Sequence, residues 1–300
     1  MLSYLHVFHA GNAADVLKHS LLIFCLTYMK QKEKPLLCVD THAGAGLYDL
    51  DGLNPPNREW ESGLGVLLRQ TGKQPEMIDA YVKHCGAARQ GKRRYLGSAA
   101  LMAKFLAQGD RLVCFELHPR QVEQLAANLS GRNVADTDVA NTDVEGRATI
   151  EVRRDDGLSG LTSLLPPPSR RGLVFIDPPW EESSEYERVP RAVETALKRF
   201  PEGTCIVWYP LLARDKSARD MNVRNKKPAL PDILFALSQG KCLRAELHTQ
   251  AATHSPRGMY GSGLVVFNPP WTLHAACEEA LPYLAKTLGG ANGGWRLEQK

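Results

Sequence analysis

Short uninterrupted apolar runs recur along the chain and predict buried strands. They are rich in β-branched and aromatic residues and lack the alternation of a half-exposed strand, which is typical of a parallel sheet. Stretches of helical character separate most of the runs, so strands and helices alternate along the chain. This pattern predicts an α/β protein. The predicted strands cover 35–40, 111–116, 149–153, 173–176, 204–209, 243–248 and 263–267.

The central run, Gly172–Trp180, reads GLVFIDPPW and ends in a carboxylate, two prolines and an aromatic ring. Because proline cannot donate a ladder hydrogen bond, we expect this strand to stop at Asp177 and the strand 204–209 to stop before Pro210. Open α/β sheets bind ligands at the carboxyl ends of their strands, so Asp177 and Trp180 are candidates for a ligand site. The structural alternative is a plain turn with Asp177 as a cap and Trp180 as packing.

Polar residues also follow the first three strands. THAGAG (41–46) comes directly after the first strand, and its two glycines would let the backbone approach a ligand closely. Glu116 ends the second strand, where such folds hold ribose hydroxyls, and Asp156 follows the third. Asp49 occupies the place of the third glycine in a dinucleotide fingerprint. The pattern therefore favours a nucleoside-containing ligand and argues against a dehydrogenase.

Two helix starts lie near these strands. Asn12 precedes a helical stretch that runs to about Lys32, with Asp15 in the first turn, as the helix dipole prefers. His19 lies one turn beyond Asp15, and the pattern alone places it on the helix surface. Ser98 is a candidate N-cap for the helix that follows it.

The remaining segments define the domain organisation. We expect one domain over 1–300, with 50–95 as an inserted helical subdomain, because this stretch interrupts the alternation of strands and helices. The polar segment 130–147 predicts an exposed loop without a catalytic role. From Ala275 an amphipathic helix is followed by glycine-rich residues that we expect to be poorly ordered.

Composition narrows the class of protein. The 300 residues carry a net charge of +4, which permits a polyanionic partner without requiring one. The seven cysteines are scattered without a C-x-x-C pair, so we expect buried, reduced thiols and neither disulfides nor a zinc site. No segment reads as a signal peptide or a membrane span, and we expect a cytoplasmic protein.

The order of the polar strand ends resembles that of the class I S-adenosylmethionine-dependent methyltransferases. This resemblance implies a Rossmann-like, seven-stranded methyltransferase sheet whose seventh strand is antiparallel, with S-adenosyl-L-methionine as cofactor. Gly44 and Gly46 would approach the methionine part of the cofactor. Glu116 would hold the ribose and Asp156 would lie by the adenine ring.

Asp177-Pro-Pro-Trp180 also resembles the signature of enzymes that methylate an exocyclic amine. Such an amine on adenine shares its lone pair with the ring and is a poor nucleophile. Asp177 and a main-chain carbonyl would accept its two N–H bonds, and Trp180 would stack on the base. Asn268-Pro-Pro-Trp271 has the same form. Because it follows the strand expected to be antiparallel, its end would face away from the cofactor, and we assign it a structural role.

Longer motifs narrow the resemblance. HAGNAADVLKH begins at His9, DTHAGAG at Asp40, ELHP at Glu116, DPP at Asp177 and RGM at Arg257. Together they resemble the bacterial 23S ribosomal RNA adenine-N6 methyltransferases of the J type, over nearly the whole chain.

This family resemblance implies methyl transfer to the N6 amine of an adenine in 23S ribosomal RNA, by a monomer without a metal. Asp177 would be the catalytic proton acceptor. Tyr4, Pro178 and Trp180 would contact the RNA, although the family usually has tyrosine where Trp180 stands. The implied cofactor site comprises His19, His42, Gly44, Gly46, Ser98, Glu116, Asp156, Gly157 and Asp177.

Other functions fit part of the pattern. A DNA adenine-N6 or protein-glutamine methyltransferase would use the same tetrapeptide, and the residues themselves do not separate these substrates. A non-enzymatic nucleotide-binding protein would keep the glycines but would not need Asp-Pro-Pro-aromatic. Basic clusters at 92–94, 170–171 and 224–227 are candidate phosphate contacts.

Overall fold

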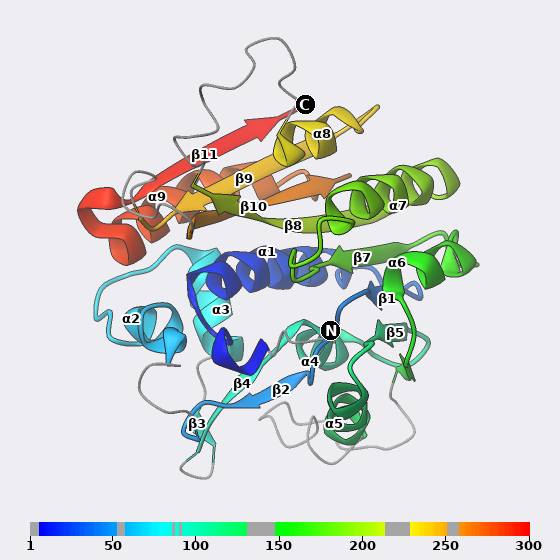
Figure 1. Ribbon diagram of the computed structural model, residues 1–300, viewed down its shortest axis with the longest axis horizontal. Coiled ribbons are helices and arrows are strands. Elements are labelled where there is room, and N and C mark those ends of the chain that lie inside the picture. Colours follow the sequence, from blue (N-terminus) through cyan, green and yellow to red (C-terminus); the bar gives the residue numbers. More distant parts are fainter. Residues whose placement is uncertain are drawn as a thin grey trace.

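The apolar runs come together as neighbouring strands of one sheet, with helices packed against it (Figure 1). The computed structural model describes residues 6–52, 58–85, 88–89, 92–130, 148–213, 229–250 and 258–300. Its strands are β1 (Leu37–Asp40), β2 (Leu47–Asp49), β3 (Ala88–Arg89), β4 (Lys92–Leu96), β5 (Arg111–Phe115), β6 (Thr149–Arg153), β7 (Gly172–Ile176), β8 (Thr204–Leu212), β9 (Cys242–His248), β10 (Met259–Phe267) and β11 (Gly294–Gln299). Its α-helices are α1 (Ala13–Met29), α2 (Leu64–Leu68), α3 (Glu76–Cys85), α4 (Ser98–Phe105), α5 (Pro119–Leu129), α6 (Gly157–Gly160), α7 (Glu185–Arg199), α8 (Leu230–Ala236) and α9 (Leu273–Gly289).

The main sheet has the strand order β11-β9-β10-β8-β7-β1-β5-β6. Strands β6, β5, β1, β7 and β8 pair in parallel. Strand β10 runs antiparallel to both β8 and β9, and β11 runs antiparallel to β9. Along the chain β10 is the seventh strand of this sheet. The predicted Rossmann-like methyltransferase sheet with its seventh strand antiparallel is therefore confirmed, but in the described part of the chain the sheet has eight strands and not the predicted seven.

The strand order reverses between β1 and β7, because the chain builds β5 and β6 on one side of β1 and β7 and β8 on the other. Both strands are buried along their whole length, which explains why their sequences are continuously apolar. Asp40, the last residue of β1, pairs with Phe175, so Asp177 lies just beyond the paired segment. Open α/β sheets bind ligands at such a reversal, outside the carboxyl ends of the strands.

Helices pack in two groups against the sheet. Helix α1 contacts α3, α4, α9 and β10, and α4 also contacts α5, β1 and β5. Helices α6, α7 and α8 form a second contacting group. As predicted, Asn12 caps α1, and its side-chain oxygen accepts a hydrogen bond from the Asp15 N–H at 3.0 Å. In the described part of the chain no helix is both long and apolar enough to cross a membrane.

The prediction that Pro210 stops its strand was wrong. Strand β8 continues through Pro210 to Leu212. Its pairing with β7 ends at Val207, so Pro210 lies where only β10 pairs with β8. A missing N–H is tolerated where one side of a strand has no partner.

The prediction of a poorly ordered, glycine-rich C-terminus was also wrong. After α9 the glycines turn the chain, and Gly294–Gln299 pairs with β9 as the eighth strand of the sheet. A Cβ on Gly293 would lie 1.9 Å from the Ala285 carbonyl oxygen, so this turn requires glycine. The glycine-rich composition suggested disorder. The prediction failed because this strand is stabilised by pairing with β9, which the local sequence does not reveal.

The stretch 50–95 contains helices α2 and α3 and also strands β3 and most of β4, which form a small second sheet with β2 in the order β2-β4-β3. Its interpretation as an inserted subdomain stays a prediction. Ser98 is not the N-cap of α4: Gly97 holds that position, and Ser98 is the first residue of the helix. The seven cysteines are free and buried, as predicted.

Candidate active site

A cavity of about 160 Å³ opens at the carboxyl edge of the sheet, at the reversal between β1 and β7. The residues that line it come from the ends of β1, β5, β6 and β7 and from the N-terminal segment. Gly46 is not part of its lining, although its φ of +74° gives it the left-handed backbone that favours glycine. Residues that were predicted from the sequence and line the cavity are His19, His42, Gly44, Ser98, Glu116, Asp156, Gly157 and Asp177.

Glu116 joins the glycine loop to the end of β5. One carboxylate oxygen accepts the Gly44 N–H at 2.9 Å and the other accepts the His118 N–H at 2.7 Å. Gly44 has a φ of +58°, and a Cβ there would lie 2.3 Å from the Tyr48 hydroxyl. The loop therefore needs glycine both for its backbone and for this close approach. Burial raises the pKa of Glu116, and the N–H groups of His118 and Gly44 partly offset this.

Asp156 is the N-cap of α6. Its Oδ1 accepts the N–H groups of Leu158 and Ser159, and its Oδ2 pairs with Arg188. Burial opposes ionisation, but the Ser159 N–H and Arg188 outweigh it and hold the pKa of Asp156 below its usual range. A Cβ on Gly157 would lie 2.2 Å from the Thr41 carbonyl oxygen, so the turn after β6 packs directly on the turn after β1.

Asp40 is a fully buried carboxylate beside this cavity. Its Oδ1 accepts the His42 N–H at 3.2 Å, while Oδ2 has no hydrogen-bond partner among the described residues. Burial raises its pKa to about 7, which the Ser98 hydroxyl and the His42 N–H partly offset. An unpartnered buried acceptor costs stability unless a bound donor satisfies it. Asp40 is fully buried and is not among the residues that line the cavity.

Two neutral imidazoles line the same cavity. Burial lowers the pKa of His19 to about 3 and that of His42 to about 4. His19 Nδ1 lies 2.6 Å from the Tyr95 hydroxyl, and this hydrogen bond fixes the orientation of the imidazole ring. The Thr41 hydroxyl donates to the Phe175 carbonyl at 3.2 Å and lies 2.8 Å from His42 Nδ1. The expectation from the pattern alone that His19 lies on the helix surface was wrong: its exposed fraction is 2%.

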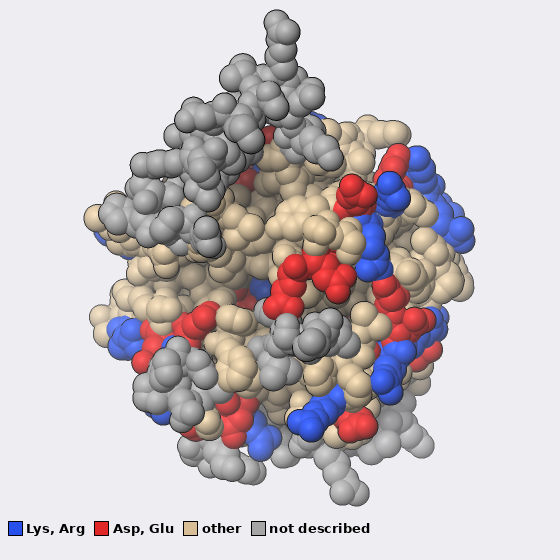
Figure 2. Space-filling view, viewed as in Figure 1, with Lys and Arg blue, Asp and Glu red and all other residues tan. Residues whose placement is uncertain are grey.

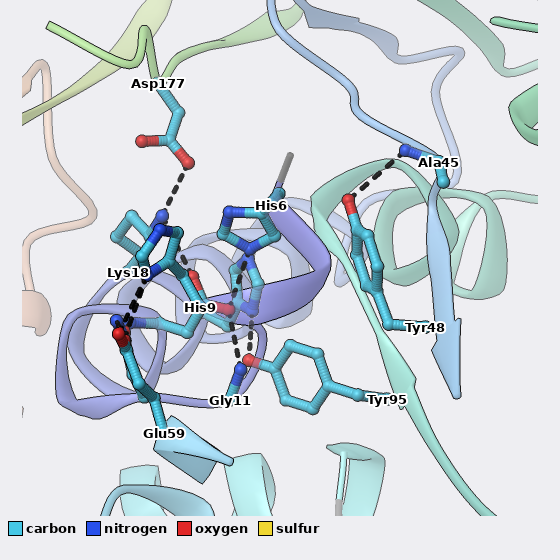
Figure 3. A network of polar contacts seen from close by, with 12 residues as sticks. His6, His9, Gly11, Lys18, Ala45, Tyr48, Glu59, Tyr95 and Asp177 are labelled. Atoms are coloured by element: carbon cyan, nitrogen blue, oxygen red, sulfur yellow. Dashed lines mark hydrogen bonds and ion pairs between the residues drawn. The ribbon is translucent and has the colours of Figure 1, made fainter. Parts of the chain in front are cut away.

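Asp177 is the end of a chain of charged contacts that begins in the N-terminal segment (Figure 3). Its Oδ2 accepts a hydrogen bond from Lys18 Nζ at 2.7 Å, and Lys18 also pairs with Asp15 Oδ1 at 2.9 Å. Asp15 Oδ2 in turn contacts His6 Nε2 at 3.0 Å and accepts the Gly11 N–H at 2.9 Å. Burial raises the pKa of Asp177, and Lys18 partly offsets this.

A second cavity, of about 590 Å³, adjoins the first. Pro179 and His6 belong to the linings of both cavities. Trp180 lies in its wall with an exposed fraction of 8%, a φ of +57° and its ring 5.1 Å from that of Tyr186. A left-handed backbone is unusual for a bulky residue and is found mainly at functional sites. Pro178 is buried.

Comparison with known proteins decides the family. Residues 33–299 match the family described as "Ribosomal RNA large subunit methyltransferase D, RlmJ". The chain is 39% identical to the ribosomal RNA large subunit methyltransferase J of Haemophilus influenzae, covering 99% of this chain and 98% of that protein. It is 36% identical to the Escherichia coli protein of the same name, covering 98% and 96%. This chain belongs to the RlmJ family.

A solved structure agrees. A Legionella pneumophila protein of known crystal structure is 30% identical, superposes with a TM-score of 0.79, and covers 97% of this chain and 98% of that one. The RlmJ family is a family of RNA methyltransferases. This is the class of enzyme that the sequence motifs predicted. Methyltransferases of this class use S-adenosylmethionine.

Several residues of this RlmJ-family site had no predicted role, although Lys18 and Thr41 lie within the motifs HAGNAADVLKH and DTHAGAG. Lys18, Thr41, Tyr48, Gln121 and Arg188 reach the two cavities or their charged groups only in the folded chain. Lys18 had one usable signal: it lies three residues after Asp15 on a helix that is otherwise apolar in its next turns, which indicates a buried ion pair. Tyr4 lies outside the described residues.

The basic clusters predicted as phosphate contacts lie in different parts of the chain's fold, and some lie outside the described residues. Arg171 lies at the start of β7, on the opposite edge of the sheet from the cavities, and its guanidinium donates to the carbonyls of Lys34 and Met29. Arg170 pairs with Glu202 at the same edge. Arg93 packs on Trp60 and pairs with Asp51. The pair 170–171 therefore stabilises the fold away from the site, and the cluster 224–227 lies outside the described residues.

The mouth of the first cavity is acidic. Glu181, Glu182 and Glu185 line it together with Glu116, and Arg188 is the basic residue of its lining. Figure 2 shows acidic side chains gathered near the middle of this face. A cavity with this charge favours a cationic ligand, such as one that carries a sulfonium and an ammonium group.

Proposed function

We propose that this chain transfers a methyl group from S-adenosylmethionine to the N6 amine of an adenine in 23S ribosomal RNA. The observation that carries the proposal is Asp177-Pro-Pro-Trp180 at the boundary of the two cavities, with Asp177 lining the first cavity and Trp180 the adjoining one. The names of the RlmJ relatives support ribosomal RNA of the large subunit as the substrate.

We assign the cofactor to the first cavity. We assign the ribose hydroxyls to Glu116 and the adenosine ring to Asp156 and Gly157. His19, His42 and Ser98 complete the wall, with Gly44 and Gly46 in the turn after β1. Neutral imidazoles suit this position because they accept or donate hydrogen bonds without repelling a cationic ligand. When bound, S-adenosylmethionine supplies an electrophilic methyl group.

Asp177 activates the target amine. Lys18 occupies its Oδ2, which leaves Oδ1 to accept an N–H of the amine. The main-chain carbonyl at the bend, at Pro178, accepts the second N–H, and the lone pair is then directed out of conjugation with the ring. After transfer the nitrogen carries an extra proton, which Asp177 takes up, and its raised pKa favours this step.

The target base enters through the second cavity. Adenine in a duplex is stacked and paired, so it must be splayed out to reach Asp177. Trp180 offers an aromatic wall for the base, and Tyr4, which precedes the described residues, is proposed to contact the RNA. A loop or junction of the RNA meets this requirement better than an intact duplex.

The test is transfer of labelled methyl to defined substrates. Purified protein with S-adenosylmethionine is incubated with unmodified 23S ribosomal RNA, with duplex DNA and with a glutamine-containing protein, and products are mapped by mass spectrometry. We expect N6-methyladenosine in the RNA and no product in DNA or protein. The Asp177→Ala variant controls for a contaminating enzyme. A methyl group found only on DNA, on glutamine or on a different atom of the RNA contradicts the proposal.

A further inference from the structure

Strands β8 and β10 extend beyond the catalytic edge of the sheet. The parallel pairing of β7 with β8 places Ile176 opposite Val207, so Asp177 is level with Trp208. Strand β8 continues to Leu212, four residues farther, which at about 3.3 Å per residue is roughly 13 Å. Strand β10 pairs with it over this whole length, and the Ala213 N–H still bonds to the Gly258 carbonyl at 3.2 Å. The projection is therefore an ordered two-stranded wall.

One face of this wall lines the second cavity. Side chains alternate along a strand, and Trp208, Pro210 and Leu212 all belong to the cavity lining. Met259 lies opposite Leu212 on β10, next to a register shift between Met259 and Gly261. A Cβ on Gly261 would lie 2.3 Å from the Leu247 carbonyl oxygen, so glycine is required at this bulge. Bulges next to active sites redirect side chains toward ligands.

The wall has a lower and an upper half. In the lower half Lys18 covers the Trp208 ring, with Nζ 4.8 Å from the ring centre, and the exposed fraction of Trp208 is 9%. In the upper half Leu212 and Met259 have exposed fractions of 48% and 38%. An apolar cross-strand pair thus forms a step at the rim of the cavity, roughly 13 Å above the level of Asp177.

We propose that this apolar step, Leu212 and Met259, binds the nucleobase adjacent to the target adenine in the RNA strand. The inference rests on the proposed function, in which the target base lies at Asp177. The RNA chain is covalently continuous, so the neighbouring nucleotide must lie next to the cavity mouth. The step is too far from Asp177 to contact the target amine. The second cavity reaches from Pro179 and Trp180, which follow Asp177 in the chain, to the step.

The chemistry of the step suits the face of a base. Leucine and methionine side chains present apolar surface, and the polarisable thioether of Met259 makes favourable contacts with aromatic rings. Thr249, Gln250 and Ser262 lie in the same lining and carry hydrogen-bonding groups for a base edge. The step therefore orients the strand through one flanking base while Asp177 selects the target.

The test compares three versions of one short RNA that contains the target adenine: intact, with the 5′ neighbour abasic and with the 3′ neighbour abasic. For the unaltered protein we expect kcat/KM to fall about 5- to 30-fold for one of the abasic RNAs, as for the loss of one modest apolar contact. Met259→Ala and Leu212→Ala should show that fall with intact RNA and no further fall with that abasic RNA. Met259→Leu should restore most of the rate.

Leu68→Ala is the matched control, because Leu68 has an exposed fraction of 43% on α2, outside the lining of both cavities. Full discrimination between intact and abasic RNA in both step variants, or a loss that multiplies with the abasic loss, overturns the inference. A lowered melting temperature with unchanged discrimination does so as well, because the step then only stabilises the chain. No methylation of the intact RNA by the unaltered protein contradicts the proposed function instead.

Discussion

Two tetrapeptides of nearly the same sequence end two neighbouring regions of the sheet and have opposite environments. Asp177-Pro-Pro-Trp180 follows β7, whose carboxyl end faces the cavities. Asn268-Pro-Pro-Trp271 follows β10, which runs antiparallel to β8, so it lies at the other edge of the sheet. The expectation from the sequence that the second motif faces away from the site is confirmed by this pairing.

The polar residue of each motif has a different role. Asp177 is bonded to Lys18 and retains an oxygen for a ligand. The side-chain amide of Asn268 donates hydrogen bonds to the carbonyls of Pro201 and Gly203, at 2.7 and 2.8 Å. The aromatic residues differ too: Trp180 is 8% exposed and Trp271 is 76% exposed. The comparison teaches that such a motif acquires chemistry from the direction of its strand, because direction decides which groups face the polar side chain.

The largest expected effect comes from changing Asp177, the proposed proton acceptor. Asp177→Ala should lower the rate of methyl transfer by about 10²- to 10⁴-fold, the usual contribution of a positioned acid or base. Cofactor affinity should change little in comparison, because the lost group acts mainly on the amine. Single-turnover transfer and calorimetry measure the two separately. An active, folded Asp177→Ala protein would reverse the assignment of the two motifs.

The next effect concerns the cofactor end of the same edge. Glu116→Ala should weaken S-adenosylmethionine binding by about 1.5–3 kcal/mol, the range for hydrogen bonds to a charged group. Calorimetry measures it, with Glu123→Ala, an exposed glutamate on α5, as the control. Unchanged affinity in a folded Glu116→Ala protein would remove this carboxylate from the site.

The second motif should affect stability and not turnover. Asn268→Ala loses two hydrogen bonds and places alanine at a φ of +50°, so unfolding should become easier by about 1–3 kcal/mol. Asn268→Gly loses the same bonds but relaxes the backbone and should cost less. Denaturant unfolding measures both variants. A loss of turnover at full stability in either would show that the amino edge takes part in the reaction.

The smallest effect is a shift in pH dependence. Asp177 accepts a proton only when ionised, so transfer should fall as the pH drops through its raised pKa. Lys18 lowers that pKa, and Lys18→Met should therefore raise it further and move the acid limb of kcat to higher pH. Lys198→Met, at an exposed pair with Glu194 on α7, is the control. A limb that does not move, or that moves to lower pH, would separate Lys18 from the ionisation of Asp177.

Much of the fold followed from the sequence because local patterns report burial. Continuous apolar runs marked the strands of the parallel part of the sheet, and prolines, glycines and acids marked the ends of β1, β5 and β7. The antiparallel seventh strand came with the family resemblance. Each of these signals lies within a few residues of the strand that it marks, so the sequence alone is enough to recognise it.

The site was predictable only in part. The sequence singled out eight residues that the fold brings to one cavity. Seven of them follow a predicted strand or lie in a long motif, and Ser98 was a candidate N-cap of a helix. It did not reveal that Lys18 reaches Asp177, because the two are 159 positions apart. The role of each remaining site residue stays a prediction until a variant is measured.

The sequence by itself determined the parallel strands, their polar ends and the membership in a methyltransferase family. Only the tertiary structure decided that Pro210 stays within a strand, that the glycine-rich C-terminus pairs with β9 and that His19 is buried against Tyr95. Each of these depends on a partner distant in the chain. A hydrogen bond or an apolar contact stabilises a residue only when that partner is present, and local sequence carries no record of it.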